Sequence, residues 1–204
     1  MVDAQTALAH LKQGNQRFIS ALQGDEWLMK RPRISSAEQG QQPFAIILGC
    51  SDSRVPAEMV FDQGLGDLFV IRVAGNIVQP SQIGSVEFAA AQFATRLVVV
   101  MGHTHCGAIK ATVEELSRPS ESQSPNLKVI VDKIAPAVKP LLQTACQCDK
   151  DTLLAKAVRA NVHTSVEQLR HGSAILEQLI ANEDLMIVGA EYDIETGKVI
   201  FFED

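Results

Sequence analysis

The sequence predicts an α/β fold: a central parallel β-sheet of about four strands with an antiparallel edge strand, flanked by helices and preceded by an N-terminal helical arm. Two observations predict it. Short apolar runs of strand length alternate with longer segments of helical periodicity, a pattern typical of a parallel sheet with right-handed helical crossovers. A turn signal, Glu195-Thr196-Gly197, separates the last two strand-like runs, so the final run is expected to fold back antiparallel.

The first half of the chain supplies three of the expected strands. Residues 4–18 place apolar side chains on one helical face, and residues 20–42 are expected to form a loop and a short helix that carries Trp27. Continuous apolar runs predict buried strands at residues 44–48, 68–73 and 97–101. A short helical turn is expected after Pro56, and an alanine-rich helix over residues 85–94.

The second half of the chain is expected to be mostly helical. Helical spacing of apolar residues predicts helices over residues 107–116, 126–145 and 151–170, and a further helix from residue 172. Pro136 and Pro140 are expected to interrupt the second of these helices, because proline lacks the amide donor. A fourth strand is expected over residues 185–192, and the antiparallel edge strand over residues 199–202.

Length and composition exclude several classes of protein. A chain of 204 residues with 46% hydrophobic residues can bury one full core, so we expect a single domain over residues 1–204. The net charge of −6 argues against a nucleic-acid partner, and no apolar run approaches the roughly 18 residues of a membrane span. Four cysteines without a visible export signal indicate reduced thiols and a cytoplasmic location.

Potential metal ligands follow two of the expected strands. Cys50 ends the first strand, and His103 and Cys106 follow the third as an H-x-x-C pair. Thiolate and imidazole are preferred zinc donors, and three of them leave a fourth position for water. A helix beginning after Cys106 would favour its thiolate. The spacing alone is equally compatible with two structural cysteines and a hydrogen-bonded histidine.

Asp52 and Arg54 lie beside the first of these candidate ligands. A bidentate pair with Arg54 would keep the Asp52 carboxylate ionised and oriented, so that it could accept a hydrogen bond from a zinc-bound water. The alternative is a solvated loop ion pair, which is worth about 0–1 kcal/mol. Asp52 is also close enough in sequence to reach the zinc itself and fill the open position.

Two further groups of residues leave alternatives open. His105 lies between two candidate ligands and could complete a four-ligand structural site, but a surface or proton-exchange role is the preferred interpretation. Cys146 and Cys148 form C-x-C in a polar stretch, where a second metal or redox site competes with two semi-exposed structural thiols.

The motif Cys50-Ser51-Asp52-Ser53-Arg54, followed by His103-x-x-Cys106, resembles the β-class carbonic anhydrases. Four further stretches are similar to that family: Gly14-Asn15-x-Arg17-Phe18, Asp62-Gln63-Gly64-Leu65-Gly66-Asp67, Arg72-Val73-Ala74-Gly75-Asn76 and Val188-Gly189-Ala190-x-Tyr192-Asp193. The resemblance spans about residues 8–202. It implies an α/β subunit with one zinc held by Cys50, His103 and Cys106, and a catalytic dyad of Asp52 and Arg54.

The resemblance also implies an oligomer and a substrate pocket. A homodimer or homotetramer is expected, in which the arm of residues 1–40 packs on the partner subunit. Gln41, Phe69 and Gly107 are assigned to the substrate pocket. In one form of the family Asp can close the zinc site under control of a bicarbonate pocket, and the tryptophan of that pocket is replaced here by Ile47. Arg72 matches an arginine of that pocket, but this arginine does not distinguish the two forms. Because the tryptophan is missing, we expect the constitutively open form.

The function implied by the resemblance is zinc-dependent reversible hydration of carbon dioxide to bicarbonate and a proton. A zinc-bound hydroxide, oriented by the Asp52–Arg54 dyad, would attack the carbon dioxide. One rival is a carbonyl sulfide or carbon disulfide hydrolase that uses the same site. The other is a non-catalytic protein that binds zinc or bicarbonate. The expected partners are the small-molecule substrate and further copies of the chain, with no nucleic acid and no membrane.

Overall fold

The computed structural model describes residues 2–24, 40–118, 124–144 and 149–202. Its centre is a five-stranded sheet in the order β2-β1-β3-β4-β5. The strands are β1 (Ala45–Gly49), β2 (Leu68–Arg72), β3 (Leu97–His103), β4 (Met186–Tyr192) and β5 (Val199–Phe201). The first four are parallel, and β5 pairs antiparallel with β4. The predicted fold class is therefore confirmed.

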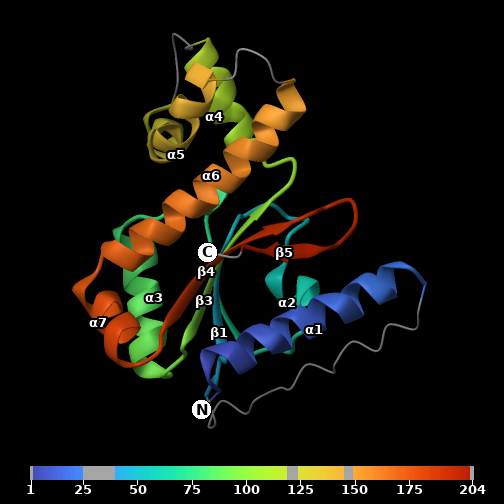
Figure 1. Ribbon diagram of the computed structural model, residues 1–204, viewed down its shortest axis with the longest axis vertical. Coiled ribbons are helices and arrows are strands. Elements are labelled where there is room, and N and C mark those ends of the chain that lie inside the picture. The colour runs from blue at the N-terminus through green and yellow to red at the C-terminus, as the bar shows by residue number, and fades with distance from the viewer. Residues whose placement is uncertain (1, 25–39, 119–123, 145–148, 203–204) are drawn as a thin grey trace.

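Helices cover both faces of this sheet (Figure 1). α1 (Ala4–Leu22) and α2 (Ala57–Val60) lie on one face, and α3 (Pro80–Gln92), α6 (Lys150–His171) and α7 (Ala174–Asn182) lie on the other. Alternate strand residues point to opposite faces. Ile47 and Val99 accordingly pack in the core under α1, while Ile46 and Val98 pack in the core under α3 and α6. All four side chains are fully buried, which explains why the strands read as continuous apolar runs.

A third core lies beyond the carboxyl ends of the parallel strands. α4 (Gly107–Ser117) and α5 (Pro125–Thr144) pack there against the first half of α6, at the top of Figure 1. Cys50 and Cys106 both pack in this core. The candidate metal ligands therefore lie where the sheet meets the third core.

Two predicted helices differ from those observed. α3 begins at Pro80 rather than at residue 85, because Pro80 occupies the first helical turn, where its missing amide costs no hydrogen bond. α5 runs through Pro136 and Pro140 without a break. Burial of Ile134 and Val138 in the third core stabilises α5 at the point where the prolines remove amide donors.

The stretch Gly14-Asn15-x-Arg17 fixes α1 to its own chain. Asn15 donates from Nδ2 to the carbonyls of Val60 (3.1 Å) and Gly197 (2.8 Å), and its Oδ1 accepts from an amide of β5. A Cβ at Gly14 would lie 1.8 Å from the carbonyl oxygen of Phe61, so only glycine allows this close approach. Contact of the N-terminal arm with a partner subunit stays a prediction, and Trp27 lies outside the described residues.

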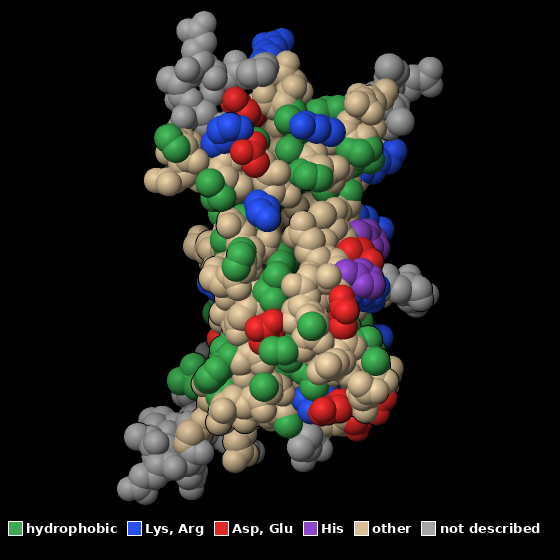
Figure 2. Space-filling view, turned by 90° about the vertical axis from the view of Figure 1, so that its left-hand side faces the viewer, with side chains coloured by type: hydrophobic (Ala, Val, Ile, Leu, Met, Phe, Trp, Pro, Cys, Tyr) green, Lys and Arg blue, Asp and Glu red, His purple; other side chains and the backbone are tan. Residues whose placement is uncertain are grey.

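Charged side chains of both signs lie on the described surface. On the face that carries α3 and α7, acidic and basic side chains are interspersed (Figure 2). Among the described helices, none is long and apolar enough to cross a bilayer.

Candidate metal centre

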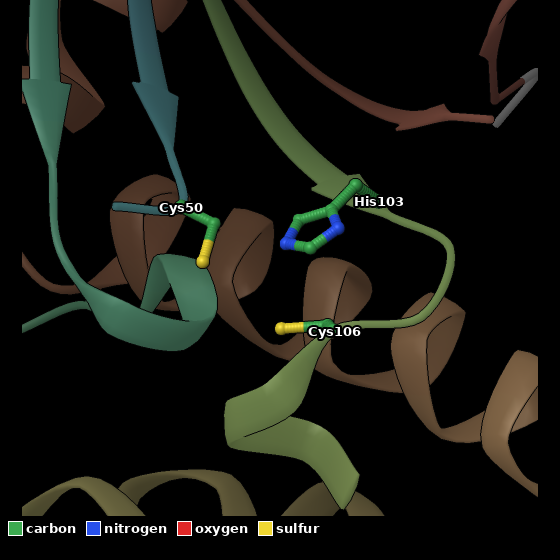
Figure 3. A group of neighbouring side chains, drawn as sticks. All are labelled: Cys50, His103 and Cys106. Atoms are coloured by element: carbon green, nitrogen blue, oxygen red, sulfur yellow. The ribbon is translucent and has the colours of Figure 1, made fainter. Parts of the chain in front are cut away.

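The candidate ligands meet at the ends of two neighbouring strands. β1 and β3 pair in parallel register, with Gly49 opposite Met101. Cys50 therefore follows β1 at the edge of the sheet where β3 ends in His103, and Cys106 caps the start of α4. The two sulfurs and one ring nitrogen lie within 4.8 Å of one another. Figure 3 shows all three side chains pointing to a common centre.

The histidine of this group presents an unpartnered nitrogen to the two sulfurs. His103 is fully buried, and its Nδ1 lies 2.8 Å from the carbonyl oxygen of Thr104, so Nδ1–H is the donor. The other ring nitrogen, Nε2, is buried and has no hydrogen-bond partner among the described residues. Leaving such an atom unsatisfied is costly, and a cation bound at Nε2 would remove that cost.

The pKa values of the two thiols shift in opposite directions. The hydrogen bond from Cys106 lowers the pKa of the Cys50 thiol, while burial opposes the shift. The same hydrogen bond, together with burial, raises the pKa of Cys106. A bound dication would offset the repulsion between two thiolates and would displace the remaining protons. Two sulfurs and an imidazole fit zinc and leave its fourth position open.

Asp52 and Arg54 form a bidentate ion pair beside this group. Arg54 donates from Nε to Oδ1 at 2.9 Å and from Nη2 to Oδ2 at 2.7 Å, and its backbone amide also donates to Oδ1 at 3.0 Å. These hydrogen bonds hold the pKa of the Asp52 carboxyl far below its usual range. Oδ2 lies 4.0 Å from Nε2 of His103. The carboxylate is thus ionised and positioned next to the candidate metal position.

Arg72 supports the loop that carries Cys50 and Asp52. Its guanidinium donates from Nε to the carbonyl of Cys50 at 2.9 Å and from Nη2 to the carbonyl of Asp52 at 2.5 Å. Sequence reasoning associated Arg72 with a bicarbonate pocket and missed this supporting contact. The available signal was its position as the last residue of a strand adjacent to β1.

The residues assigned to the substrate pocket are not gathered at this centre within one chain. Gly107 adjoins it as the first residue of α4, and it is exposed. Phe69 lies three residues before the end of β2, about 10 Å back along the strand, and its ring contacts Phe88 and Phe93. Gln41 is exposed before β1. The substrate roles of these residues stay predictions.

His105 lies outside the group of candidate ligands. Its backbone has a φ of 57°, its side chain is 63% exposed, and Nε2 lies 3.3 Å from a carboxylate oxygen of Glu195. A cavity of about 520 Å³ adjoins this part of the loop, between the start of α4 and α6. Cys146 and Cys148 lie outside the described residues, so their alternatives stay open.

Comparisons with known proteins identify the family. A family model described as carbonic anhydrase matches residues 45–199. The chain is 37% identical over 191 residues to a carbonic anhydrase of Mycolicibacterium smegmatis, and 35% identical over 192 residues to carbonic anhydrase 2 of Mycobacterium tuberculosis. In both cases the alignment covers 93% of this chain and 88% of the relative.

Solved structures agree with the sequence comparisons. The β-carbonic anhydrase CcaA superposes with a TM-score of 0.72 and 28% identity, covering 81% of this chain and 76% of that one. The chain belongs to the β-class carbonic anhydrases. The match to the carbonic anhydrase family model contains the three candidate ligands and both members of the Asp52–Arg54 pair, and it leaves Gln41 outside.

Proposed function

We propose that this β-class carbonic anhydrase hydrates carbon dioxide reversibly to bicarbonate and a proton, with one zinc per chain held by Cys50, His103 and Cys106. The observation that carries the proposal is the buried, unpartnered Nε2 of His103, which faces two sulfurs beside an ionised carboxylate. Relatives that align over 93% of the chain are named carbonic anhydrases, which supports the choice of substrate.

The residues of the centre divide the chemical work. Zinc at this position would lower the pKa of a bound water toward neutrality and so supply a nucleophile. Asp52 accepts a hydrogen bond from the attacking water and orients its lone pair toward the carbon of carbon dioxide. The new C–O bond forms as one C=O electron pair moves onto its oxygen, and the released proton passes to buffer. Arg54 holds both oxygens of Asp52, which would keep the carboxylate from taking the open position of a bound zinc.

We assign the enzyme to the constitutively open form. Position 47, where the other form carries the tryptophan of its bicarbonate pocket, is occupied by Ile47, and this side chain is fully buried in the core under α1. The Arg72 guanidinium already donates hydrogen bonds to the carbonyls of Cys50 and Asp52. Both observations favour an Asp52 that stays with Arg54 near neutral pH.

We further propose that the enzyme works as a homodimer or homotetramer in the cytoplasm. β2 is an edge strand of the sheet, and large apolar side chains are exposed near it: Leu65 is 61% and Phe88 is 53% exposed. An open edge with exposed apolar residues favours association with a second copy. Cys50 and Cys106, the two cysteines among the described residues, are free thiols, which fits a reducing compartment.

The rival activities are separated by a direct comparison of substrates. Stopped-flow rates on carbon dioxide, carbonyl sulfide and carbon disulfide are measured with the same zinc-loaded preparation. We expect carbon dioxide hydration to be faster than either hydrolysis by orders of magnitude. Faster hydrolysis of a sulfur gas would replace the proposed substrate. Full zinc occupancy without turnover of any of the three would favour a non-catalytic protein.

A further inference from the structure

We propose that Asn161 and Ser165 of α6 are positioning residues of the metal centre. They hold the turn after β2 so that the backbone N–H of Gly75 donates a hydrogen bond to the sulfur of Cys50. This inference rests on the proposed role of Cys50 as a zinc ligand.

The turn after β2 lies directly beside one of the candidate ligands. Residues Ala74–Asn76 form a 3₁₀ turn, and the amide nitrogen of Gly75 lies 3.4 Å from Sγ of Cys50. Figure 3 shows this turn next to the Cys50 sulfur. Gly75 has a φ of 71°, and a Cβ there would lie 2.8 Å from Cδ1 of Ile134. Glycine therefore allows both the left-handed backbone and the close packing that direct the amide at the sulfur.

Two buried side chains of α6 fix the carbonyls of the same turn. Asn161 donates from Nδ2 to the carbonyl of Gly75 at 2.8 Å, and Ser165 donates from Oγ to the carbonyl of Asn76 at 3.0 Å. The two residues are four apart and so lie on one face of α6. Their exposed fractions are only 1% and 2%. Asn76 itself has a φ of 43°, a conformation that such contacts help to maintain.

The arrangement acts on the metal through the sulfur. An N–H donor withdraws charge from a thiolate and fixes its direction, and groups that orient metal ligands in this way affect metal affinity by 10- to 100-fold when removed. Asn161 holds the peptide between Gly75 and Asn76, and Ser165 holds the one between Asn76 and Ile77. Loss of either contact would loosen the turn that directs the preceding peptide, between Ala74 and Gly75, which carries the Gly75 N–H. The Cys50 sulfur would then lose its donor, although no metal ligand had been changed.

The contact can be tested with the protein in which cadmium-113 replaces zinc. The nuclear spins of cadmium and an amide proton couple through an N–H···S bond, so the wild type should show a coupling assigned to the Gly75 amide. Asn161→Leu should abolish or strongly reduce this coupling and weaken zinc affinity, measured by chelator competition, by about 10-fold. Ser165→Ala is a milder variant and should change both quantities in the same direction.

Thr164→Val is the matched control, because Thr164 donates its hydroxyl only within α6, to the carbonyl of Ala160. It should leave the coupling and the zinc affinity unchanged. If the wild type binds one cadmium but shows no coupling to Gly75, the inference is overturned while the proposed metal site survives. Unchanged coupling and affinity in both Asn161→Leu and Ser165→Ala would also overturn it. A wild type that binds no metal would instead overturn the proposed function.

Discussion

Arg54 binds the carboxylate of Asp52 through two parallel hydrogen bonds, at 2.9 Å and 2.7 Å, while Oδ2 of that carboxylate lies 4.0 Å from Nε2 of His103. The carboxylate therefore faces the candidate metal position and has both oxygens paired with a cation. Such a geometry suits a group that accepts a hydrogen bond from a nucleophilic water, and a purely structural metal site would not need it.

The first prediction concerns this pair. Arg54→Ala should lower kcat/KM by about 100-fold or more, because the carboxylate loses its orientation and can turn to the metal. Zinc content and melting temperature should change little, because Arg54 is half exposed and is not a candidate ligand. Asp52→Asn should likewise retain zinc and lose rate. Arg118→Ala, at an exposed position after α4, is the control and should match the wild type. Wild-type turnover by Arg54→Ala would remove the dyad from the mechanism.

A second prediction concerns the pH dependence of turnover. The hydrogen bonds from Arg54 lower the pKa of the Asp52 carboxyl below its usual value near 3.8. A lowered pKa in the folded protein means that the carboxylate stays charged as the pH falls, until strongly acid solution. Asp52 should therefore add no ionisation to the kcat/KM profile above about pH 4. Above that pH the profile should follow a single ionisation, that of the zinc-bound water. A steep cooperative rise confined to alkaline pH would contradict the open-form assignment.

Gly14 and Gly84 provide a matched pair for the packing of α1. Gly14→Ala would place a methyl group 1.8 Å from the carbonyl of Phe61, and forced overpacking of this kind costs about 1–3 kcal/mol. Gly84→Ala adds a methyl group to the exposed face of α3, where no atom lies within 4 Å, and should stabilise the folded protein by about 0.5–1 kcal/mol. Denaturant unfolding at one fixed protein concentration measures both. A tolerated Gly14→Ala would show that α1 does not pack as described.

The proposed association through the β2 edge gives a fourth prediction. Leu65→Asp or Phe88→Asp should shift the sedimentation of the enzyme from an oligomer toward the monomer, because a charge would be buried in the interface. Leu127→Asp changes an equally exposed leucine on α5 and should leave the oligomer intact. An oligomer that survives both changes near β2 would place the interface elsewhere.

Much of the fold was predictable because its signals are local. Ile46, Ile47 and Leu48 are buried on both faces of the sheet, so they read as a continuous apolar run, and strand ends could be placed from Cys50 and His103. The start of α3 was placed too late because residues 80–84 carry little apolar periodicity. Pro80 at the first turn was the available signal.

The supporting contacts of the metal centre were less accessible to sequence reasoning. Asn161 and Ser165 lie 86 and 89 residues from the backbone groups that they bind, so no local pattern connects them. The predicted substrate pocket also depends on how distant parts of the chain are placed in space. Phe69 lies near the start of β2, and a single chain leaves it away from the carboxyl ends of the strands.

Zinc titration of the metal-free enzyme, followed by stopped-flow hydration of carbon dioxide, tests the central proposal most directly. We predict that activity rises in proportion to added zinc and stops rising at one zinc per chain. Cys106→Ser should neither retain zinc nor become active, whereas the double variant Cys146→Ser/Cys148→Ser should follow the wild-type curve. Carbon dioxide hydration without zinc, or full zinc occupancy and activity in Cys106→Ser, would contradict the assignment of the metal centre.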